Sequence, residues 1–245
     1  MKAIALAAGF ATRLYPLTKD RPKPLLDVAG RPVLSWLLDR VLAVPDIDEV
    51  VVVTNARFHA DFEQWRDDYA CHVPIRVIND GATNDTDPVG AIRDLALGWR
   101  ALEPNADVLV AAGDNLLRFA LEPYVDAFLR AGTPTLLARR LQGGMPPGRF
   151  GEITTDETGR ITRFREKPKQ PESDLAATCL YLLPAPTRDL LETYVARGRD
   201  LDAPGNFIAW LAQQTEVHAA EFDAADMFDI GNKETLENAR RLFRG

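Results

Sequence analysis

Residues 2–25 read KAIALAAGFATRLYPLTKDRPKPL and join a short apolar run to a loop of small and basic residues. The run from Ala3 to Ala8 predicts a buried strand that ends at Gly9. Small residues after a strand let backbone N–H groups approach an anion closely, and Arg13 and Lys23 add positive charge. The stretch therefore predicts a phosphate-binding loop. Its spacing matches neither the Gly-x4-Gly-Lys-Ser/Thr loop nor the Gly-x-Gly-x-x-Gly dinucleotide loop.

The rest of the chain alternates short β-branched runs with longer segments of helical period. This alternation is typical of βαβ units and predicts an α/β fold with a mostly parallel sheet. Residues 152–155 and 161–165 favour two strands joined by a turn at 156–159. The other expected strands are 49–54, 75–78, 108–112 and 177–183, and the expected helices are 33–44, 56–65, 90–102 and 233–243, with Asn55 as the cap of the second helix.

Length and composition favour one large domain that spans residues 1–245 and buries a proper core. A turn-rich break after residue 140 divides it into halves 1–140 and 141–245. No apolar run approaches the roughly 18 residues of a membrane span, and no signal-peptide cleavage site is recognisable, so a cytoplasmic protein is expected. The formal charge of −7 argues against nonspecific nucleic-acid binding. Cys71 and Cys179 indicate neither a disulfide framework nor a zinc site.

A second polar motif, Gly113-Asp114-Asn115, follows the predicted strand 108–112. Ligands in open α/β sheets bind beyond the carboxyl ends of the strands, so Gly9 and Asp114 are expected to meet at one site. Taken alone, Asp114 is equally well explained as a turn residue or a helix cap. Residues 79–88, rich in Asn, Asp, Thr and Gly, predict a binding loop.

The opening motif, from Leu6 through Gly9 and Arg13 to the Pro22-Lys23 pair, resembles the signature of the nucleotide-sugar pyrophosphorylases, or sugar-1-phosphate nucleotidyltransferases. The likeness is greatest to the short glucose-1-phosphate thymidylyl- and uridylyltransferases. It implies a single Rossmann-like (GT-A-like) nucleotidyltransferase domain with a mixed, mostly parallel central sheet and a smaller sugar-side β lobe. The substrates it implies are a nucleoside triphosphate and a sugar-1-phosphate, and a homo-oligomer is compatible with it.

The same resemblance implies the residues that bind the nucleotide. Arg13 would stabilise the charge on the departing pyrophosphate, and Lys23 would bind phosphate oxygens; with Asp114 they form the expected catalytic set. Ala11 stands where the family has glycine, and we expect the loop to work provided that its backbone does not require a positive φ there. The nucleotide-binding residues expected from the resemblance are Leu6, Ala7, Ala8, Gly9, Ala11, Thr12, Asp80, Gly90 and Gly113.

Two aspartates resemble the metal ligands of the family. Asp114 belongs to the Gly-Asp-Asn element, and Asp229 to the late element Phe228-Asp229-Ile230-Gly231. The resemblance implies that they hold Mg²⁺, which accepts a few carboxylates together with phosphate and water oxygens.

The sugar-binding residues implied by the resemblance are Gly151, Glu166, Lys167 and Thr178. Glu166 would accept hydrogen bonds from sugar hydroxyls, and Lys167 would contact the sugar phosphate. By itself the Glu-Lys-Pro triplet is more often a surface charge pair that ends a strand. Cys179 replaces a usual glycine, which bears on how closely the strand approaches the sugar.

Several functions stay open at this point. UTP or dTTP with glucose-1-phosphate is the favoured pair, and GTP with mannose-1-phosphate is the alternative. A cytidylyltransferase for a non-sugar phosphate such as phosphocholine and a catalytically silent regulatory subunit are further alternatives. The loop 79–90 is longer and more acidic than in the thymidylyl and uridylyl enzymes and predicts no base. After Asp229 only one helix is expected, which indicates a minimal version of the family.

Overall fold

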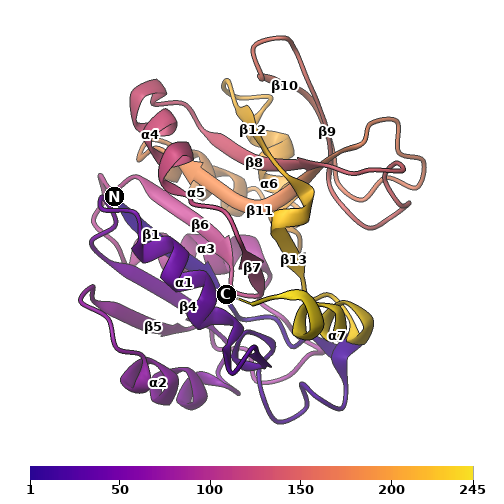
Figure 1. The fold of residues 1–245 in the computed structure, drawn as a ribbon. Coiled ribbons are helices and arrows are strands. Elements are labelled where there is room, and N and C mark those ends of the chain that lie inside the picture. The colour runs from indigo at the N-terminus through magenta and orange to yellow at the C-terminus, as the bar shows by residue number, and fades with distance from the viewer. Residues whose placement is uncertain (245) are drawn as a thin grey trace.

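The computed structural model describes residues 1–244, and its centre is a nine-stranded sheet within those residues (Figure 1). The strands follow the order β10-β9-β11-β6-β1-β4-β5, and β8 pairs with both β11 and β12. Two small sheets, β2-β3 and β7-β13, lie apart from it. The strands are β1 Lys2–Leu6, β2 Asp27–Val28, β3 Arg31–Pro32, β4 Val50–Thr54, β5 Ile75–Asn79, β6 Val108–Ala112, β7 Asn115–Leu117, β8 Thr135–Arg140, β9 Glu152–Thr155, β10 Ile161–Arg165, β11 Leu175–Leu183, β12 His218–Phe222 and β13 Met227–Asp229.

The strands of the first half form a parallel layer. β1 pairs with β4 and with β6, and β4 pairs with β5, all in parallel. The whole of β4 is buried, because helices cover both faces of this part of the sheet. The parallel arrangement sends the carboxyl ends of β1, β4, β5 and β6 to one edge of the sheet, where the loops of interest emerge.

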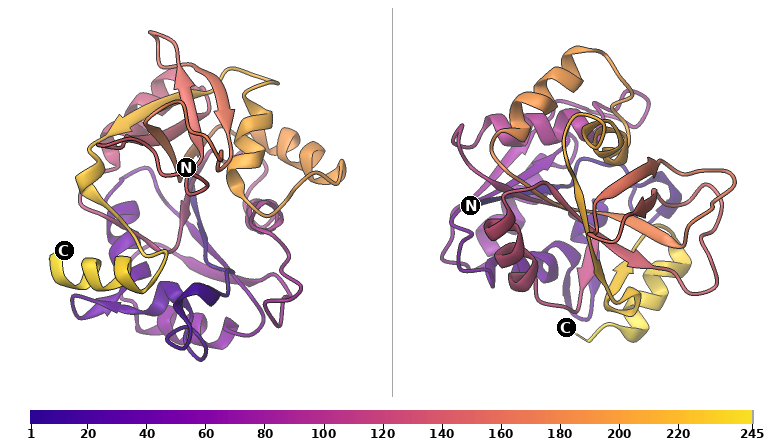
Figure 2. Two further views of the ribbon diagram at one scale, coloured as in Figure 1. Left: turned by 90° about the vertical axis from the view of Figure 1, so that its right-hand side faces the viewer. Right: turned by 90° about the horizontal axis from the view of Figure 1, so that it is seen from above.

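Helices cover the two faces of the sheet, as the turned views of Figure 2 show. One apolar cluster joins α1, α2 and α4 to alternate side chains of β1 such as Ala3 and Ala5. The other joins α3, α5 and α6 to Ile4, which points to the opposite face. The helices are α1 Val33–Leu42, α2 His59–Asp68, α3 Ala91–Arg100, α4 Glu122–Ala131, α5 Thr187–Ala196, α6 Pro204–Leu211 and α7 Lys233–Leu242.

The second half adds antiparallel strands to the same sheet. β11 runs antiparallel to β6 and so joins the two halves of the chain. β9 and β10 form a hairpin around a turn in which the Asp156 carboxylate accepts hydrogen bonds from the N–H groups of Thr158 and Arg160. β13 pairs with β7 and passes in front of the sheet edge in Figure 1.

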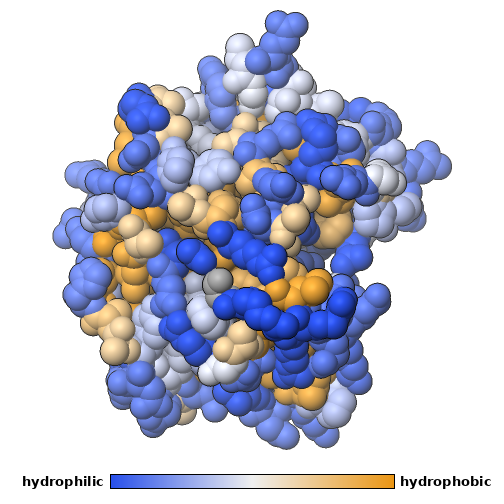
Figure 3. Space-filling model, in the orientation of Figure 1, coloured by the Kyte–Doolittle hydropathy of each residue, from blue (hydrophilic) through white to orange (hydrophobic). Residues whose placement is uncertain are grey.

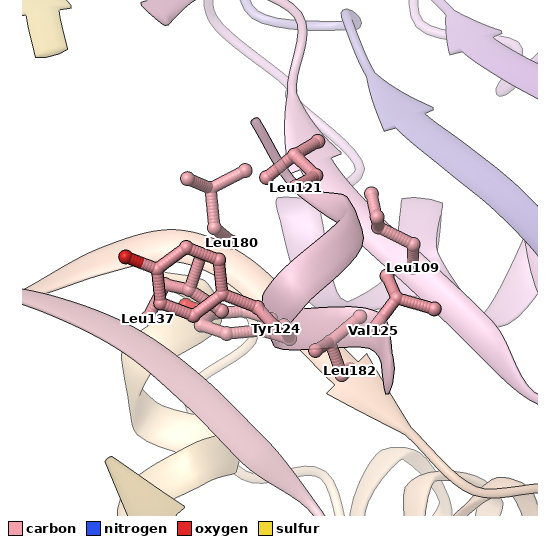
Figure 4. A pocket seen from close by; sticks show the side chains of 8 residues that line it. Leu109, Leu121, Tyr124, Val125, Leu137, Leu180 and Leu182 are labelled. Atoms are coloured by element: carbon pink, nitrogen blue, oxygen red, sulfur yellow. The ribbon is translucent and has the colours of Figure 1, made fainter. Parts of the chain in front are cut away.

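An apolar cavity of about 10 Å³ lies within the core between α4 and the sheet, and Figure 4 shows its leucine and valine walls. It lacks ionisable side chains other than Tyr124 and Tyr181, and its size matches at most one water molecule. It is a packing gap away from the loops at the sheet edge. Its lining residues are Leu109, Leu121, Tyr124, Val125, Leu137, Leu180, Tyr181 and Leu182.

The expected α/β class with a mixed, mostly parallel sheet is confirmed. One helix begins later than predicted: residues 56–58 form a turn, and α2 starts at His59. None of the helices in residues 1–244 is long and apolar enough to cross a bilayer.

Candidate functional site: the carboxyl edge of the sheet

The loop after β1 has a left-handed residue at its centre. Ala11 has φ 50° and ψ 45°, directly before a short 3-10 helix, Thr12–Leu14. The Thr18 hydroxyl donates to the Ala11 carbonyl at 2.8 Å and holds the loop in this shape. From the sequence we expected the loop to tolerate Ala11 if the backbone did not require a positive φ there. The backbone does have a positive φ, so this condition is not met. The left-handed conformation costs an L-residue roughly 1–2 kcal/mol.

Asn55, at the end of β4, fixes the start of the loop. Its side-chain N–H donates to the Ala8 carbonyl at 2.8 Å, and its side-chain oxygen accepts from the N–H of Phe58. The residue is fully buried. The prediction that Asn55 caps a helix at residue 56 is wrong, because its two hydrogen bonds join the loop to the following turn instead. Nothing in the local sequence distinguishes these uses, since Asn is common in both.

Lys23 and Asp114 form an ion pair across the site. Both side chains are 18% exposed. Burial alone would lower the pKa of Lys23, but the adjacent Asp114 carboxylate more than offsets it and raises this pKa above its usual value. The pair lines a pocket of about 140 Å³ together with Leu6, Ala7, Gly9, Ala11 and Pro24.

Gly113 lies where the end of β6 contacts the end of β1. Its N–H donates to the Leu6 carbonyl at 2.8 Å. A Cβ at Gly113 would lie 3.2 Å from that same oxygen and 3.4 Å from Pro24, so a larger residue would push the strand ends apart. The predicted meeting of Gly9 and Asp114 at one edge of the sheet is therefore observed.

Asp229 reaches the same place from the far end of the chain. It lies on β13, opposite Asn115 of β7 and thus next to Asp114. Burial and the negative charge of Asp114 raise the pKa of Asp229, while Lys23 opposes the shift. Asp114 and Asp229 carry two negative charges, and Lys23 neutralises only one of them. The remaining charge favours the binding of an additional cation.

The two aspartate carboxylates suit a hard divalent cation that takes its remaining oxygen ligands from substrate or water. Within residues 1–244 no group of three or more His, Cys, Asp or Glu side chains is placed to enclose a metal. Mg²⁺ commonly binds through one or two carboxylates together with substrate phosphate oxygens. Asp114 and Asp229 fit that pattern.

Arg13 lies on the exposed side of this pocket. It belongs to the 3-10 helix after Ala11, and its positive charge lowers the pKa of Lys23, which indicates that the two cations are neighbours. Arg13 forms no ion pair with a carboxylate in the described part of the chain and is exposed to solvent. Thr12, at the start of the same helix, is also exposed.

Glu166, at the end of β10, is held between two glycines. Its Oε2 lies 3.2 Å from where a Gly151 Cβ would stand, and a Cβ at Gly205 would overlap it. Burial raises the pKa of Glu166, Lys167 lowers it, and Asp200 and Asp202 raise it further. Gly205, at the start of α6, was missed by sequence reasoning because glycine there reads as an ordinary helix start.

Lys167 and Thr178, the other predicted sugar-side residues, differ in their surroundings. Lys167 has φ 45°, a strained value for a non-glycine residue, and its Nζ lies 3.4 Å from Glu166 Oε1. Thr178 is buried and its hydroxyl donates to the Leu137 carbonyl at 2.6 Å, which ties β11 to β8. Its hydroxyl is thus engaged within the sheet, so we assign Thr178 a structural role.

Cys179, on β11, lies near both Asp114 and Glu166. Burial raises the pKa of its thiol to about 12, and the charges of Asp114 and Glu166 act in the same direction. The thiol is therefore protonated and unreactive at neutral pH.

Asp80, in the loop after β5, lies beside a buried acid of α3 that the sequence did not single out. Asp80 accepts a hydrogen bond from the Ala82 N–H at 2.7 Å. Its carboxylate neighbours Asp94 of α3, and burial together with this repulsion raises the pKa of Asp94 to about 8. Gly90 has φ 96°, and its missing side chain makes room for the Leu201 carbonyl, which accepts from Ile92 N–H.

The surface in Figure 3 is largely hydrophilic, with apolar patches between charged groups. A notch is visible at its right-hand edge, between the region of α7 and the loops beside β9 and β10 in Figure 1. In the fold, Asp229 lies just before α7, and Glu166 follows β10.

Comparisons with known proteins agree with this geometry. A glucose-1-phosphate thymidylyltransferase of Streptomyces antibioticus is 31% identical over 189 residues, which are 74% of this chain and 49% of the relative. Mannose-1-phosphate guanylyltransferase 1 of Arabidopsis thaliana is 28% identical over 196 residues, 78% of this chain and 52% of the relative. The chain thus spans about half the length of these curated relatives.

A solved structure from Bacillus anthracis, provisionally named a glucose-1-phosphate thymidylyltransferase and complexed with a sucrose, superposes with a TM-score of 0.84 at 25% identity. The match covers 100% of this chain and 95% of that one. The model of the nucleotidyl transferase family matches residues 2–244. The chain therefore belongs to the nucleotidyl transferase family.

Proposed function

We propose that this protein transfers a nucleotidyl group from a nucleoside triphosphate to a sugar-1-phosphate and releases pyrophosphate. The observation that carries the proposal is the pocket between Gly9, Lys23 and Asp114, where two strand ends bring a phosphate-binding loop and a carboxylate together. UTP or dTTP with glucose-1-phosphate is the favoured pair, because the solved relative that spans the whole chain bears that sugar phosphate in its name.

In the proposed reaction an oxygen of the sugar phosphate forms a bond to the α-phosphorus of the nucleotide. The bond from that phosphorus to the bridging oxygen breaks, and its electron pair leaves with pyrophosphate. Such chemistry depends on positioning and on neutralising charge. Arg13 would neutralise the leaving pyrophosphate and Lys23 would orient the phosphates, while Glu166, Lys167 and Gly151 would hold the sugar-1-phosphate.

We propose that Asp114 and Asp229 hold Mg²⁺ when substrates are bound. The mutual repulsion of the two carboxylates, seen in the raised pKa of Asp229, supports this assignment. A bound Mg²⁺ supplies positive charge that stabilises phosphate oxygens. Lys23, which pairs with Asp114 here, would then turn to the phosphates.

Residues 1–140 would supply the nucleotide site, and residues 141–245 the acceptor site. The nucleotide site would comprise Leu6, Ala7, Ala8, Gly9, Ala11, Thr12, Asp80, Gly90 and Gly113. A reducing, cytoplasmic setting is supported by the two free cysteines, of which Cys71 is exposed.

The second candidate pair is GTP with mannose-1-phosphate. A curated relative that aligns with 78% of the chain is named a mannose-1-phosphate guanylyltransferase. Asp80, in the loop where the base is expected, carries a carboxylate, and carboxylates accept hydrogen bonds from amino groups such as that of guanine.

The test is pyrophosphate release measured with each of UTP, dTTP, GTP and CTP against glucose-1-phosphate, mannose-1-phosphate and phosphocholine, with and without Mg²⁺. We expect release with one sugar phosphate and loss of release when a chelator removes the metal. Release with phosphocholine alone would favour the cytidylyltransferase alternative. No release with any pair would contradict the proposal.

The variant that probes the chemistry is Arg13→Ala. We expect its kcat to fall by about 10²-fold or more, with a much smaller change in the KM of the triphosphate, because Arg13 acts on charge that develops in the transition state. Arg130→Ala, an exposed arginine of α4, is the matched control. Wild-type kcat in Arg13→Ala would disprove its role.

A further inference from the structure

Arg139 of β8 is a buried cation whose guanidinium is only partly hydrogen-bonded. Its side chain is part of a residue only 8% exposed, and one guanidinium N–H donates to the Met227 carbonyl at 3.2 Å. Its Nε is buried and has no hydrogen-bond partner. None of the ion pairs among residues 1–244 includes Arg139. A buried guanidinium N–H without an acceptor is costly, so this arginine is expected to serve a ligand.

Arg139 and a second arginine, Arg149, pack against the same aromatic ring, that of Phe150. The guanidinium carbon of Arg139 lies 5.3 Å from the centre of the Phe150 ring, and that of Arg149 lies 5.1 Å from it. Burial lowers the pKa of Arg139, the negative charge of Asp229 opposes this shift, and the nearby positive charge of Arg149 lowers the pKa further. The π face of the ring attracts both cations but offers no hydrogen-bond acceptor to the free Nε of Arg139.

Both arginines carry positive charge close to Asp229, one of the two candidate Mg²⁺ ligands. Their charges, like that of Lys23, oppose the raised pKa of Asp229. Met227, which accepts the hydrogen bond from Arg139, is two residues before Asp229 on β13. The arginines therefore lie near β13 and Asp229.

The phosphate loop with Arg13 occupies the opposite side, after β1. The arginines come instead from β8 and from the segment that leads into β9. Gly151 follows Phe150 directly and packs against the Glu166 carboxylate. Arg149 is thus close in the chain to Gly151, one of the residues that surround Glu166.

We propose that Arg139 and Arg149, arranged on Phe150, bind the phosphate group of the acceptor. The inference rests on the proposed function and deepens it. A sugar whose hydroxyls contact Glu166 would then direct its phosphate past Gly151 toward Arg149 and Arg139. The phosphate would supply the acceptor that the buried Nε of Arg139 lacks.

The experiment compares Arg149→Ala, Arg139→Lys and the exposed control Arg130→Ala in steady-state kinetics with both substrates varied. Arg149 is exposed, so its replacement leaves the core intact. We expect Arg149→Ala to raise the KM of the sugar phosphate tenfold or more, with the KM of the triphosphate within twofold of wild type. Arg139→Lys keeps the charge but loses the planar fork, and should raise the same KM.

A second measurement excludes a general structural effect. Inorganic phosphate should inhibit the wild type competitively with the sugar phosphate, and Arg149→Ala should weaken this inhibition by a similar factor. An unchanged KM for the sugar phosphate in both arginine variants, or an equal rise in both KM values, would overturn the assignment while the proposed function stands. A wild type without pyrophosphate release would overturn both.

Discussion

At the residue scale, the phosphate loop places a left-handed backbone on a residue that carries a Cβ. Ala11 has φ 50°, and Thr18 holds its carbonyl. The related signature has glycine at this position, where positive φ has no steric cost. Alanine is compatible with the shape because the surrounding hydrogen bonds determine it, but the strain remains in the folded state.

Ala11→Gly should therefore stabilise the protein. Release of the left-handed strain, about 1–2 kcal/mol, exceeds the 0.4–1 kcal/mol that glycine loses through its freer unfolded chain. We expect the free energy of unfolding to rise by about 0.5–1 kcal/mol in urea denaturation. Ala212→Gly, at a position with φ −63°, should lower it instead. A loss of stability in both variants would show that Ala11 is not strained.

At the element scale, α7 connects the C-terminal end of the site to the phosphate loop. Its buried residues Leu236 and Ala239 pack in one cluster with Leu14 of the loop and with Ile230, which directly follows Asp229. The helix begins with a reciprocal cap: Asn232 accepts from Thr235 N–H at 2.9 Å, and the Thr235 hydroxyl accepts from Asn232 N–H at 3.1 Å. This cap sets where the chain leaves β13.

Removing the cap should weaken the helix. Asn232→Ala is expected to lower the free energy of unfolding by about 1 kcal/mol, within the 0.5–2 kcal/mol typical of lost N-caps. Asn238→Ala, on the exposed face of the same helix, serves as the control and should change stability by less than about 0.5 kcal/mol. Thermal and urea unfolding of both variants provide the comparison. Equal losses would mean that the cap contributes nothing.

At the scale of the whole molecule, the two halves of the chain share one sheet. β6 lies at the junction, parallel to β1 on one side and antiparallel to β11 on the other. The loop after β5 and the first turn of α3 meet nearby, and there the molecule buries Asp94, which is 5% exposed and has one oxygen without a partner. The charge state of this acid is therefore coupled to global unfolding.

Asp94 makes the stability of the protein depend on pH. Burial and the neighbouring Asp80 raise its pKa from the usual 3.8 to about 8. Between these values the folded chain retains a proton that the unfolded chain has lost, so the free energy of unfolding falls as the pH rises from about 4 to about 8. Above about pH 8 both the folded and the unfolded chain have lost the proton, and the free energy of unfolding no longer falls. Below about pH 4 both states carry the proton, and Asp94 no longer makes the free energy of unfolding depend on pH.

Asp94→Asn should remove this dependence. From pH 5 to pH 8 the wild type is expected to lose about 3–4 kcal/mol more than the variant, since each pH unit between the two pKa values corresponds to about 1.4 kcal/mol. The exposed Asp126→Asn control should follow the wild type. Urea denaturation at several pH values measures the slopes. Parallel slopes in wild type and Asp94→Asn would contradict the burial of a protonated acid.

Much of the fold follows from local sequence patterns. The predicted strands 49–54 and 108–112 and the predicted helix 33–44 agree with β4, β6 and α1 to within two residues. The turn at 156–159 and the final helix were predicted equally well. These signals are local, because strand and helix periods and turn residues act within a few positions.

For the site, the sequence by itself determined the family and the candidate residues, since the phosphate loop is one continuous segment and the expected meeting of Gly9 with Asp114 follows from parallel strands. Only the tertiary structure decided the φ of Ala11, the use of Asn55, the contact of Gly205 with Glu166, and the pairing of Arg139 with Arg149. Each of these depends on side chains from distant segments, and the space and charge around them exist only after the sheet has assembled.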